Sequence, residues 1–358
     1  MSRAGAGPTL VVSLNGSRSA ADGSAVPMSP EDLVDAALAA VAAGAREVLV
    51  HPRTPCGRES LSPRVVGPLL EALRDAGLGA GGRVRGGPGP GDGVALSVAV
   101  SVGAEPDHAG RLARVRSWTV LPDRAVVRFA EPGARELAEA LLERGPAVDA
   151  EVAVRGAAVG AGAALRRLAV NAEAAADGLA VDVKVAADGP AVDAQDAMGR
   201  PAMGAGGAVC GPAGDAGVAE GGPAGDAGGA ADGPTVDAED AMGRPAVGAV
   251  GGGAGSVARF LAWPVREPAR VRLAVELASA DPGPVAELLR RLPPVPVLLF
   301  GREEAAWPAL RLAARYGTGA RIGVGDVLHL PDGRAARSNA ELVAAAARAR
   351  EVTTAGSR

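Results

Sequence analysis

Short apolar runs alternate with amphipathic segments over the first 157 and the last 100 or so residues of the chain. Eight of these runs are the right length for buried strands. They cover residues 9–14, 47–50, 94–102, 125–130, 147–154, 269–277, 295–300 and 321–324. Strands that alternate with helical segments require a parallel sheet covered by helices. Eight of them predict a (β/α)8 barrel, with a doubly wound sheet as the alternative.

Helices are predicted between these strands, where apolar residues recur every three or four positions. The first begins at Ser29-Pro30, because Ser is a favoured N-cap and Pro suits the first helical position, and it ends at Gly44. The last begins at Ser338 or Asn339, either of which can cap it. The others cover residues 63–76, 107–118, 134–144, 284–291 and 303–316, and the last runs to about residue 348.

Residues 158–256 interrupt the pattern with Gly/Ala/Pro-rich sequence. The segment 187–202 recurs almost unchanged at 231–246, and internal duplication is the simplest explanation. Such sequence buries too little apolar area to offset the entropy of ordering, so we expect disorder. The barrel would then consist of residues 1–157 (strands one to five) and 257–350, followed by a flexible tail, 351–358. Two Arg-Leu-Ala-Val segments, 167–170 and 272–275, compete for strand six, and the later one is favoured.

Composition excludes several classes of protein. The chain has 37 Lys and Arg against 41 Asp and Glu, so it lacks the basic footprint of a nucleic-acid binder. Its two cysteines, Cys56 and Cys210, are too far apart in sequence to indicate a disulfide framework or a thiolate zinc site. No run approaches the roughly 20 apolar residues of a membrane helix, and the N-terminus lacks a signal-peptide pattern. We therefore expect a cytoplasmic protein without nucleic-acid or membrane partners.

The first chemical signal is His51, which directly follows the second strand, with Arg53 after it. Ligands of α/β barrels bind at the carboxyl ends of the strands. With only three His in 358 residues, His51 is the strongest candidate for a functional side chain. The alternative is a structural His that is satisfied by neighbouring backbone groups.

Several motifs resemble those of the β-keto acid cleavage enzymes, the family of 3-keto-5-aminohexanoate cleavage enzyme. The segment 47–61 is similar to the family's H-x-H-x-R-x-x-x-G-R-E-S-L motif, and residues 321–343 resemble its closing motif. Shorter matches are Leu14-Asn15-Gly16, Trp118, Leu121-Pro122-Asp123, Glu131-Pro132-Gly133-Ala134 and Trp307-Pro308. Together they cover about residues 9–154 and 260–350.

The resemblance implies a zinc-dependent (β/α)8 enzyme that assembles as a homotetramer. Its reaction converts a β-keto acid and acetyl-CoA into acetoacetate and a new acyl-CoA by a retro-Claisen route. Zinc would bind the keto acid and polarise its carbonyl, and such a metal needs about three protein ligands.

Only one of the family's three zinc ligands is present. His51 matches the second His of the H-x-H pair, whereas Leu49 stands at the first and Gly325 stands at the carboxylate ligand. Neither Leu nor Gly can bind zinc through a side chain. Cys56, His108 and His329 are alternative ligands, and each is expected to be an ordinary loop or helix-start residue.

The remaining site residues also follow from the resemblance. Arg321 and Asp326 match catalytic positions, and Asp149 stands where the family carries a catalytic Glu. Arg321 has the alternative of a purely structural ion pair with Asp326. Phe300 and Arg302 replace a His and a Glu of close relatives. The substrate-binding residues would be Asn15, Arg53, Gly103 and Glu131.

The matching motifs and the missing zinc ligands leave two possible functions. The chain is either a β-keto acid cleavage enzyme or a metal-free, inactive relative that serves in binding or assembly.

Overall fold

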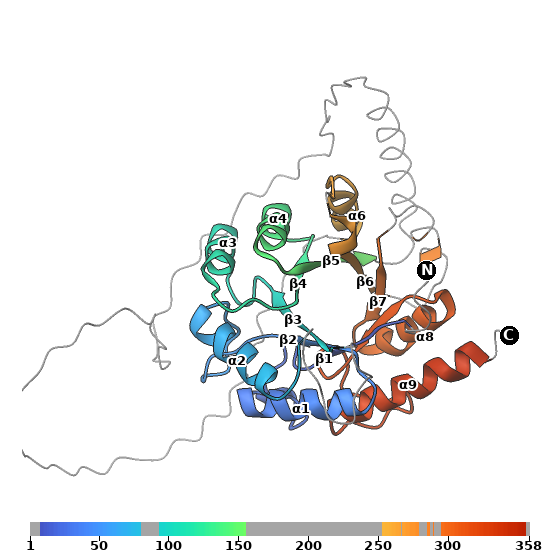
Figure 1. Ribbon diagram of the computed structural model, residues 1–358. Helices are drawn as coiled ribbons and strands as arrows, with labels where there is room; N and C mark the ends of the chain where they lie inside the picture. The colour runs from blue at the N-terminus through green and yellow to red at the C-terminus, as the bar shows by residue number, and fades with distance from the viewer. Residues whose placement is uncertain are drawn as a thin grey trace, which may run out of the picture. The chain divides into compact units, whose positions relative to one another are not determined.

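A closed barrel of eight parallel strands forms the centre of the protein (Figure 1). The computed structural model describes residues 8–79, 93–154, 253–265, 267–278, 285, 286, 289 and 295–355. Each strand pairs with its neighbours in chain order, and β8 pairs back onto β1. The strands are β1 (Leu10–Ser13), β2 (Glu47–Val50), β3 (Ala95–Val100), β4 (Arg124–Arg128), β5 (Ala147–Val154), β6 (Val271–Leu277), β7 (Val297–Gly301) and β8 (Gly319–Ile322). The closure confirms the predicted (β/α)8 fold.

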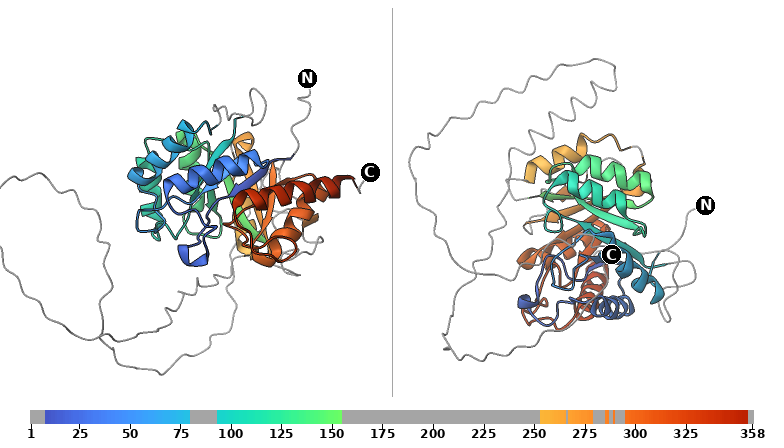
Figure 2. Two further views of the ribbon diagram at one scale, coloured as in Figure 1. Left: turned by 90° about the horizontal axis from the view of Figure 1, so that it is seen from below. Right: turned by 90° about the vertical axis from the view of Figure 1, so that its left-hand side faces the viewer.

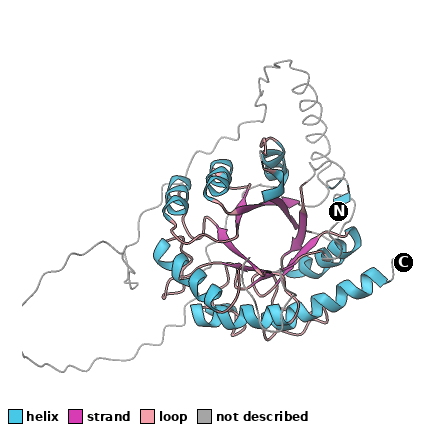
Figure 3. Cartoon of the chain, viewed as in Figure 1, coloured by secondary structure: helices cyan, strands magenta, loops and turns pink. Residues whose placement is uncertain are grey.

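Helices surround the ring of strands (Figure 3). They are α1 (Pro30–Ala42), α2 (Pro63–Asp75), α3 (His108–Ser117), α4 (Ala134–Arg144), α6 (Gly253–Leu261), α8 (Ala306–Tyr316) and α9 (Asn339–Ala355). Three short 3-10 turns accompany them, η1 (Ala20–Asp22), η2 (Pro268–Arg270) and η3 (Glu303–Ala305). The final helix, α9, packs against α1 and α8 and so joins the two ends of the barrel sequence (Figure 2). Within the described part of the chain, every helix is too short or too polar to cross a membrane.

The main hydrophobic core lies between the strands and these helices. It consists mostly of Leu, Val and Ala, as expected for a chain with few aromatic residues. Trp118 and Trp307 are both buried in it, as predicted. Their indole N–H groups donate to the backbone oxygens of Leu61 (2.9 Å) and His329 (2.8 Å), so each polar atom is satisfied inside the core.

The interior of the barrel is layered. Successive inward side chains of a strand are two residues apart. On β2, β3, β4 and β6 these positions are polar, then apolar, then polar again, as in Glu47, Leu49 and His51. The apolar layer is formed by Val11, Leu49, Ala99, Val126, Ala274, Leu298 and Phe300. It separates a polar layer at the amino ends of the strands from another at the carboxyl ends.

The predicted elements agree closely with the observed ones. All eight strands lie within two residues of their predicted bounds, and the later Arg-Leu-Ala-Val segment forms β6. The last helix was predicted to end too early. It was expected to run to about residue 348, but α9 continues to Ala355 through most of the expected tail. The expected helix 284–291 lies almost wholly outside the described residues. The repeats, the expected disorder of the insert and the earlier Arg-Leu-Ala-Val segment also lie outside them.

Candidate functional site

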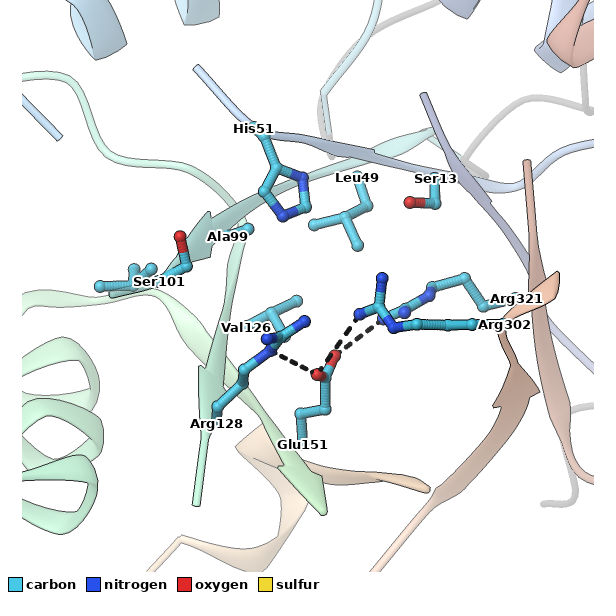
Figure 4. A pocket seen from close by; sticks show the side chains of 11 residues that line it. Ser13, Leu49, His51, Ala99, Ser101, Val126, Arg128, Glu151, Arg302 and Arg321 are labelled. Atoms are coloured by element: carbon cyan, nitrogen blue, oxygen red, sulfur yellow. Dashed lines mark hydrogen bonds and ion pairs between the residues drawn. The ribbon is translucent and has the colours of Figure 1, made fainter. Parts of the chain in front are cut away.

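A small pocket opens at the carboxyl ends of the strands, where sequence reasoning placed the site. Figure 4 shows its lining residues, Ser13, Leu49, His51, Ala99, Val100, Ser101, Val126, Arg128, Glu151, Arg302 and Arg321. The pocket has a volume of about 10 Å³, which is room for one water molecule. Any larger ligand must therefore displace a lining side chain. We call this space the mouth pocket.

His51 directly follows β2 and points into the mouth pocket (Figure 4). Asn15, which follows β1, fixes its backbone: the Asn15 amide donates to the His51 carbonyl and accepts from the His51 N–H, both at 3.0 Å. His51 is only 7% exposed, and the Nδ1 of its imidazole has no hydrogen-bond partner within the described structure. Burial lowers the pKa of His51 to about 4, so the ring is neutral at pH 7.

Glu151, on β5, is the carboxylate of the mouth pocket. It accepts from Arg128 Nε at 2.7 Å and from Arg321 Nη1 at 3.0 Å, and Arg302 Nη2 lies 3.8 Å away. Burial alone would raise the pKa of Glu151, but the charges of Arg128 and Arg321 outweigh it and the pKa is lowered. Three guanidinium groups thus share one carboxylate (Figure 4).

Arg321 and Asp326 form a bidentate ion pair. Arg321 Nε and Nη2 donate to the two carboxylate oxygens of Asp326 at 3.1 and 2.9 Å. The guanidinium also lies 3.4 Å from the centre of the Phe300 ring, at cation–π distance. Arg321 therefore lines the pocket in a fixed orientation, while Asp326 lies buried behind it.

Asp149, the expected catalytic acid of β5, does not line the mouth pocket. It lies in the polar layer at the amino ends of the strands, where Arg124 Nε donates to it at 2.9 Å and Arg272 Nε at 3.0 Å. Arg272 also reaches across the barrel to Glu47 at 2.6 Å. Asp149 and Glu151 share the inward face, but two residues of a strand span roughly 6–7 Å. The carboxylate that lines the mouth pocket is therefore Glu151, and a catalytic role for Asp149 stays a prediction.

The expected substrate-binding residues surround the mouth pocket without lining it. Asn15 holds the backbone of His51, as described above. Arg53 is buried in the loop after β2, where it donates to the carbonyls of Gly57 (2.7 Å) and Gly16 (2.8 Å). Gly103 lies in an exposed turn after β3. Glu131 accepts from the Val102 N–H at 3.5 Å, and burial raises its pKa. Their contact with a ligand stays a prediction.

The residues present do not fit a zinc site. Leu49 belongs to the apolar layer of the barrel. A Cβ atom on Gly325 would lie 2.3 Å from Ser13 Oγ and 2.7 Å from the backbone nitrogen of Gly16, so this position has no room for a carboxylate side chain. Among the described residues, no three His, Cys, Asp or Glu side chains are grouped so as to hold a metal ion.

The alternative ligands lie elsewhere. His108 and His329 are exposed and do not line the mouth pocket. Cys56 lines a separate surface groove of about 900 Å³, formed by the loops after β1 and β2 and the first turns of α1 and α2. The expectation that these are ordinary loop or helix-start residues agrees with these positions.

Sequence reasoning missed several polar residues of the mouth. Arg128 and Glu151 are the inward residues nearest to the carboxyl ends of β4 and β5 that carry a charge. The two-residue alternation of those strands could have identified them once the barrel was assumed. Ser101, at the end of β3, donates to Glu59 at 2.8 Å, and this contact between two loops has no signal in the sequence.

Comparison with known proteins supports the motif resemblance. The family model for the beta-keto acid cleavage enzyme matches residues 9–80 and 268–355, which contain His51, Arg321 and Asp326. No curated protein matches the chain. Among solved structures, type I 3-dehydroquinate dehydratase from Clostridium difficile, determined with covalently modified comenic acid, is 11% identical. That match covers 96% of this chain and 93% of the other, with a TM-score of 0.44. The family match, which covers 160 of the 358 residues, and the motifs together support the assignment of this chain to the beta-keto acid cleavage enzyme family.

Proposed function

We propose that this protein is a metal-independent member of its family that binds a small carboxylate in the mouth pocket. The observation that carries this proposal is the convergence of Arg128, Arg302 and Arg321 on the single carboxylate of Glu151. Guanidinium groups recognise carboxylates through charge-assisted hydrogen bonds. A ligand carboxylate would share these donors with Glu151 or replace it among them.

His51 supports the same kind of ligand. A neutral imidazole carries one N–H, and an N–H at the buried Nδ1 would have no acceptor. We therefore assign the proton to Nε2, from which it can be donated to a ligand oxygen. The polar lining then consists of the His51 N–H, three guanidinium groups, the hydroxyls of two serines and one carboxylate. Such a donor-rich pocket favours an anion.

The same features disfavour a zinc ion. A catalytic zinc site needs three protein ligands, and His51 is the sole family ligand present. The guanidinium groups would also repel a dication, because like charges a few ångströms apart interact strongly in a buried site. We therefore propose that zinc-dependent cleavage does not operate in this protein.

The family reaction is the second candidate. It would consume a β-keto acid and acetyl-CoA and release acetoacetate and a new acyl-CoA. Family membership favours it, as does the meeting of His51, Glu151 and Arg321 in one pocket. It ranks second because its metal does not fit the residues present.

Two measurements on the full-length protein separate these candidates. The first is the zinc content after dialysis, combined with acetyl-CoA-dependent consumption of β-keto acids. We expect far less than one zinc per chain and no turnover. The second is calorimetric titration with acetate, with neutral acetamide as the isosteric control. We expect acetate to bind more tightly than acetamide. Stoichiometric zinc with turnover would support the family reaction, and equal binding of acetate and acetamide would refute an anion site.

A further inference from the structure

Arg302 lies in a turn after β7 whose backbone is constrained on both sides. Gly301 ends β7, and a Cβ there would lie 2.3 Å from the carbonyl oxygen of Ala305, so the turn requires glycine. Glu303 has φ of +48°, the one positive value among the described non-glycine residues. Such a conformation is energetically unfavourable for a residue other than glycine and persists where surrounding contacts enforce it. Here the Glu303 N–H donates to Asp326 O at 2.9 Å, and Arg18 donates to the Glu303 carboxylate at 2.5 Å. Arg302 is thus held between two constrained residues.

The three arginines of the pocket differ in how firmly they are held. Arg321 is 3% exposed and fully engaged by Asp326 and Glu151. Arg128 is 33% exposed, but it is held by a direct hydrogen bond of 2.7 Å to Glu151. Arg302 is 30% exposed and has looser ion pairs, 3.8 Å to Glu151 and 3.2 Å to Glu276. Its guanidinium therefore has donors to offer without breaking a short hydrogen bond.

We infer that Arg302 is the specificity-determining residue of the mouth pocket and that it admits and recognises a short-chain monocarboxylate. The inference rests on the carboxylate binding proposed above. Because the pocket holds about one water molecule, a lining side chain must move before a carboxylate can bind. Apart from Arg128, which its short hydrogen bond to Glu151 holds in place, the other walls are buried, whereas Arg302 can turn toward Glu276 and solvent. A ligand carboxylate can then enter the space that the Arg302 side chain has left, and the displaced guanidinium can bind it there.

The test compares acetate with neutral acetamide in full-length variants. Arg302→Gln removes the charge, Arg302→Lys keeps it without the planar fork, and Arg311→Gln is the matched control on the exposed face of α8. We expect Arg302→Gln to weaken acetate binding by about tenfold to a hundredfold and to leave acetamide unchanged. Arg302→Lys should lose less affinity, and Arg311→Gln none.

The outcomes distinguish this inference from the function on which it rests. If wild-type protein binds acetate no better than acetamide, the carboxylate site itself is refuted. If wild-type protein prefers acetate and Arg302→Gln keeps that preference in full, the role of Arg302 alone is refuted. Thermal unfolding of the ligand-free variants checks that the fold is retained. An equal loss of acetate and acetamide binding would indicate a structural role for Arg302 and would also overturn the inference.

Discussion

Ser13 and Gly325 are packed so closely that position 325 has no room for a side chain unless neighbouring atoms shift. A Cβ on Gly325 would lie 2.3 Å from Ser13 Oγ, well inside the closest approach of real Cβ atoms. The backbone of Gly16 closes the same space, since its nitrogen would lie 2.7 Å away. In the family motif a metal-binding Glu stands at this position. In this chain the packing of the loops after β1 and β8 leaves no room for that ligand.

The substitution Gly325→Ala tests this packing. We expect it to lower the free energy of unfolding by about 1–3 kcal/mol, the usual cost of overpacking, because the Gly16 backbone must shift. Adding Ser13→Ala should recover part of the loss, because it removes the atom nearest to the new Cβ. The control is Gly255→Ala in α6, where a Cβ meets no atom within 4 Å. That change should stabilise the protein by about 0.5–1 kcal/mol. Chemical denaturation measures the free energy of unfolding of Gly325→Ala, of Ser13→Ala/Gly325→Ala and of Gly255→Ala.

Restoring both missing ligands should not restore a zinc site. In Leu49→His/Gly325→Glu, the new Glu has no room beside Ser13 and the new His enters the apolar layer. Burying a polar group without a partner costs about 1–3 kcal/mol. We expect less than one-tenth of a zinc ion per chain after dialysis against buffered zinc. A folded double variant with one tightly bound zinc per chain would show that the β1 and β8 loops can separate, contrary to the packing seen here.

The fold was predictable because its signals are local. Strand runs such as residues 47–50 and helix starts such as Ser29-Pro30 depend on neighbouring residues alone, and both were located correctly. The mouth pocket was predictable in part, since His51 and Arg321 occur in recognisable motifs. Glu151 was not identified, because the motif match pointed to Asp149 and did not specify which inward residue of β5 lines the pocket.

Other features depend on contacts between distant segments. The lack of space at Gly325 arises from a loop more than 300 residues earlier in the chain, and no local pattern encodes it. The exposure of Arg302 likewise depends on the strained turn at Glu303 and on its contact with Arg18. Such features can be recognised from the folded structure and not from the sequence.

Asp149 is expected to support stability and to leave ligand binding unchanged. Asp149→Asn removes the charge that neutralises Arg124 and Arg272 in the buried layer at the amino ends of the strands. Breaking a buried ion pair by removing one partner costs about 3–5 kcal/mol. The unfolding free energy should fall by that amount, while calorimetry should give the wild-type affinity for acetate, because Asp149 does not line the mouth pocket. Loss of acetate binding in a stably folded variant would return Asp149 to the functional site.

Glu151 should act as an internal competitor of the ligand. Glu151→Gln leaves three guanidinium groups without their shared carboxylate, so the ligand-free protein should lose about 3–5 kcal/mol of stability. Acetate can then take the place of the missing carboxylate among those donors. We expect tighter acetate binding than in wild-type protein, and a larger rise in melting temperature at saturating acetate. An unchanged or weaker affinity would show that Glu151 is part of the binding surface rather than a competitor for it.

The pH dependence of the same variant identifies the charge of Glu151 as the cause. Because its pKa is lower in the folded than in the unfolded chain, its contribution is complete above the unfolded value of about 4.3. It is lost as the pH falls through the folded-state pKa. The stability difference between wild type and Glu151→Gln should therefore be constant from pH 8 to about 5 and shrink in more acidic buffer. Glu304→Gln, on the exposed turn η3, should differ little from wild type at any pH. A difference for Glu151→Gln that stays constant down to pH 3 would assign its effect to shape rather than charge.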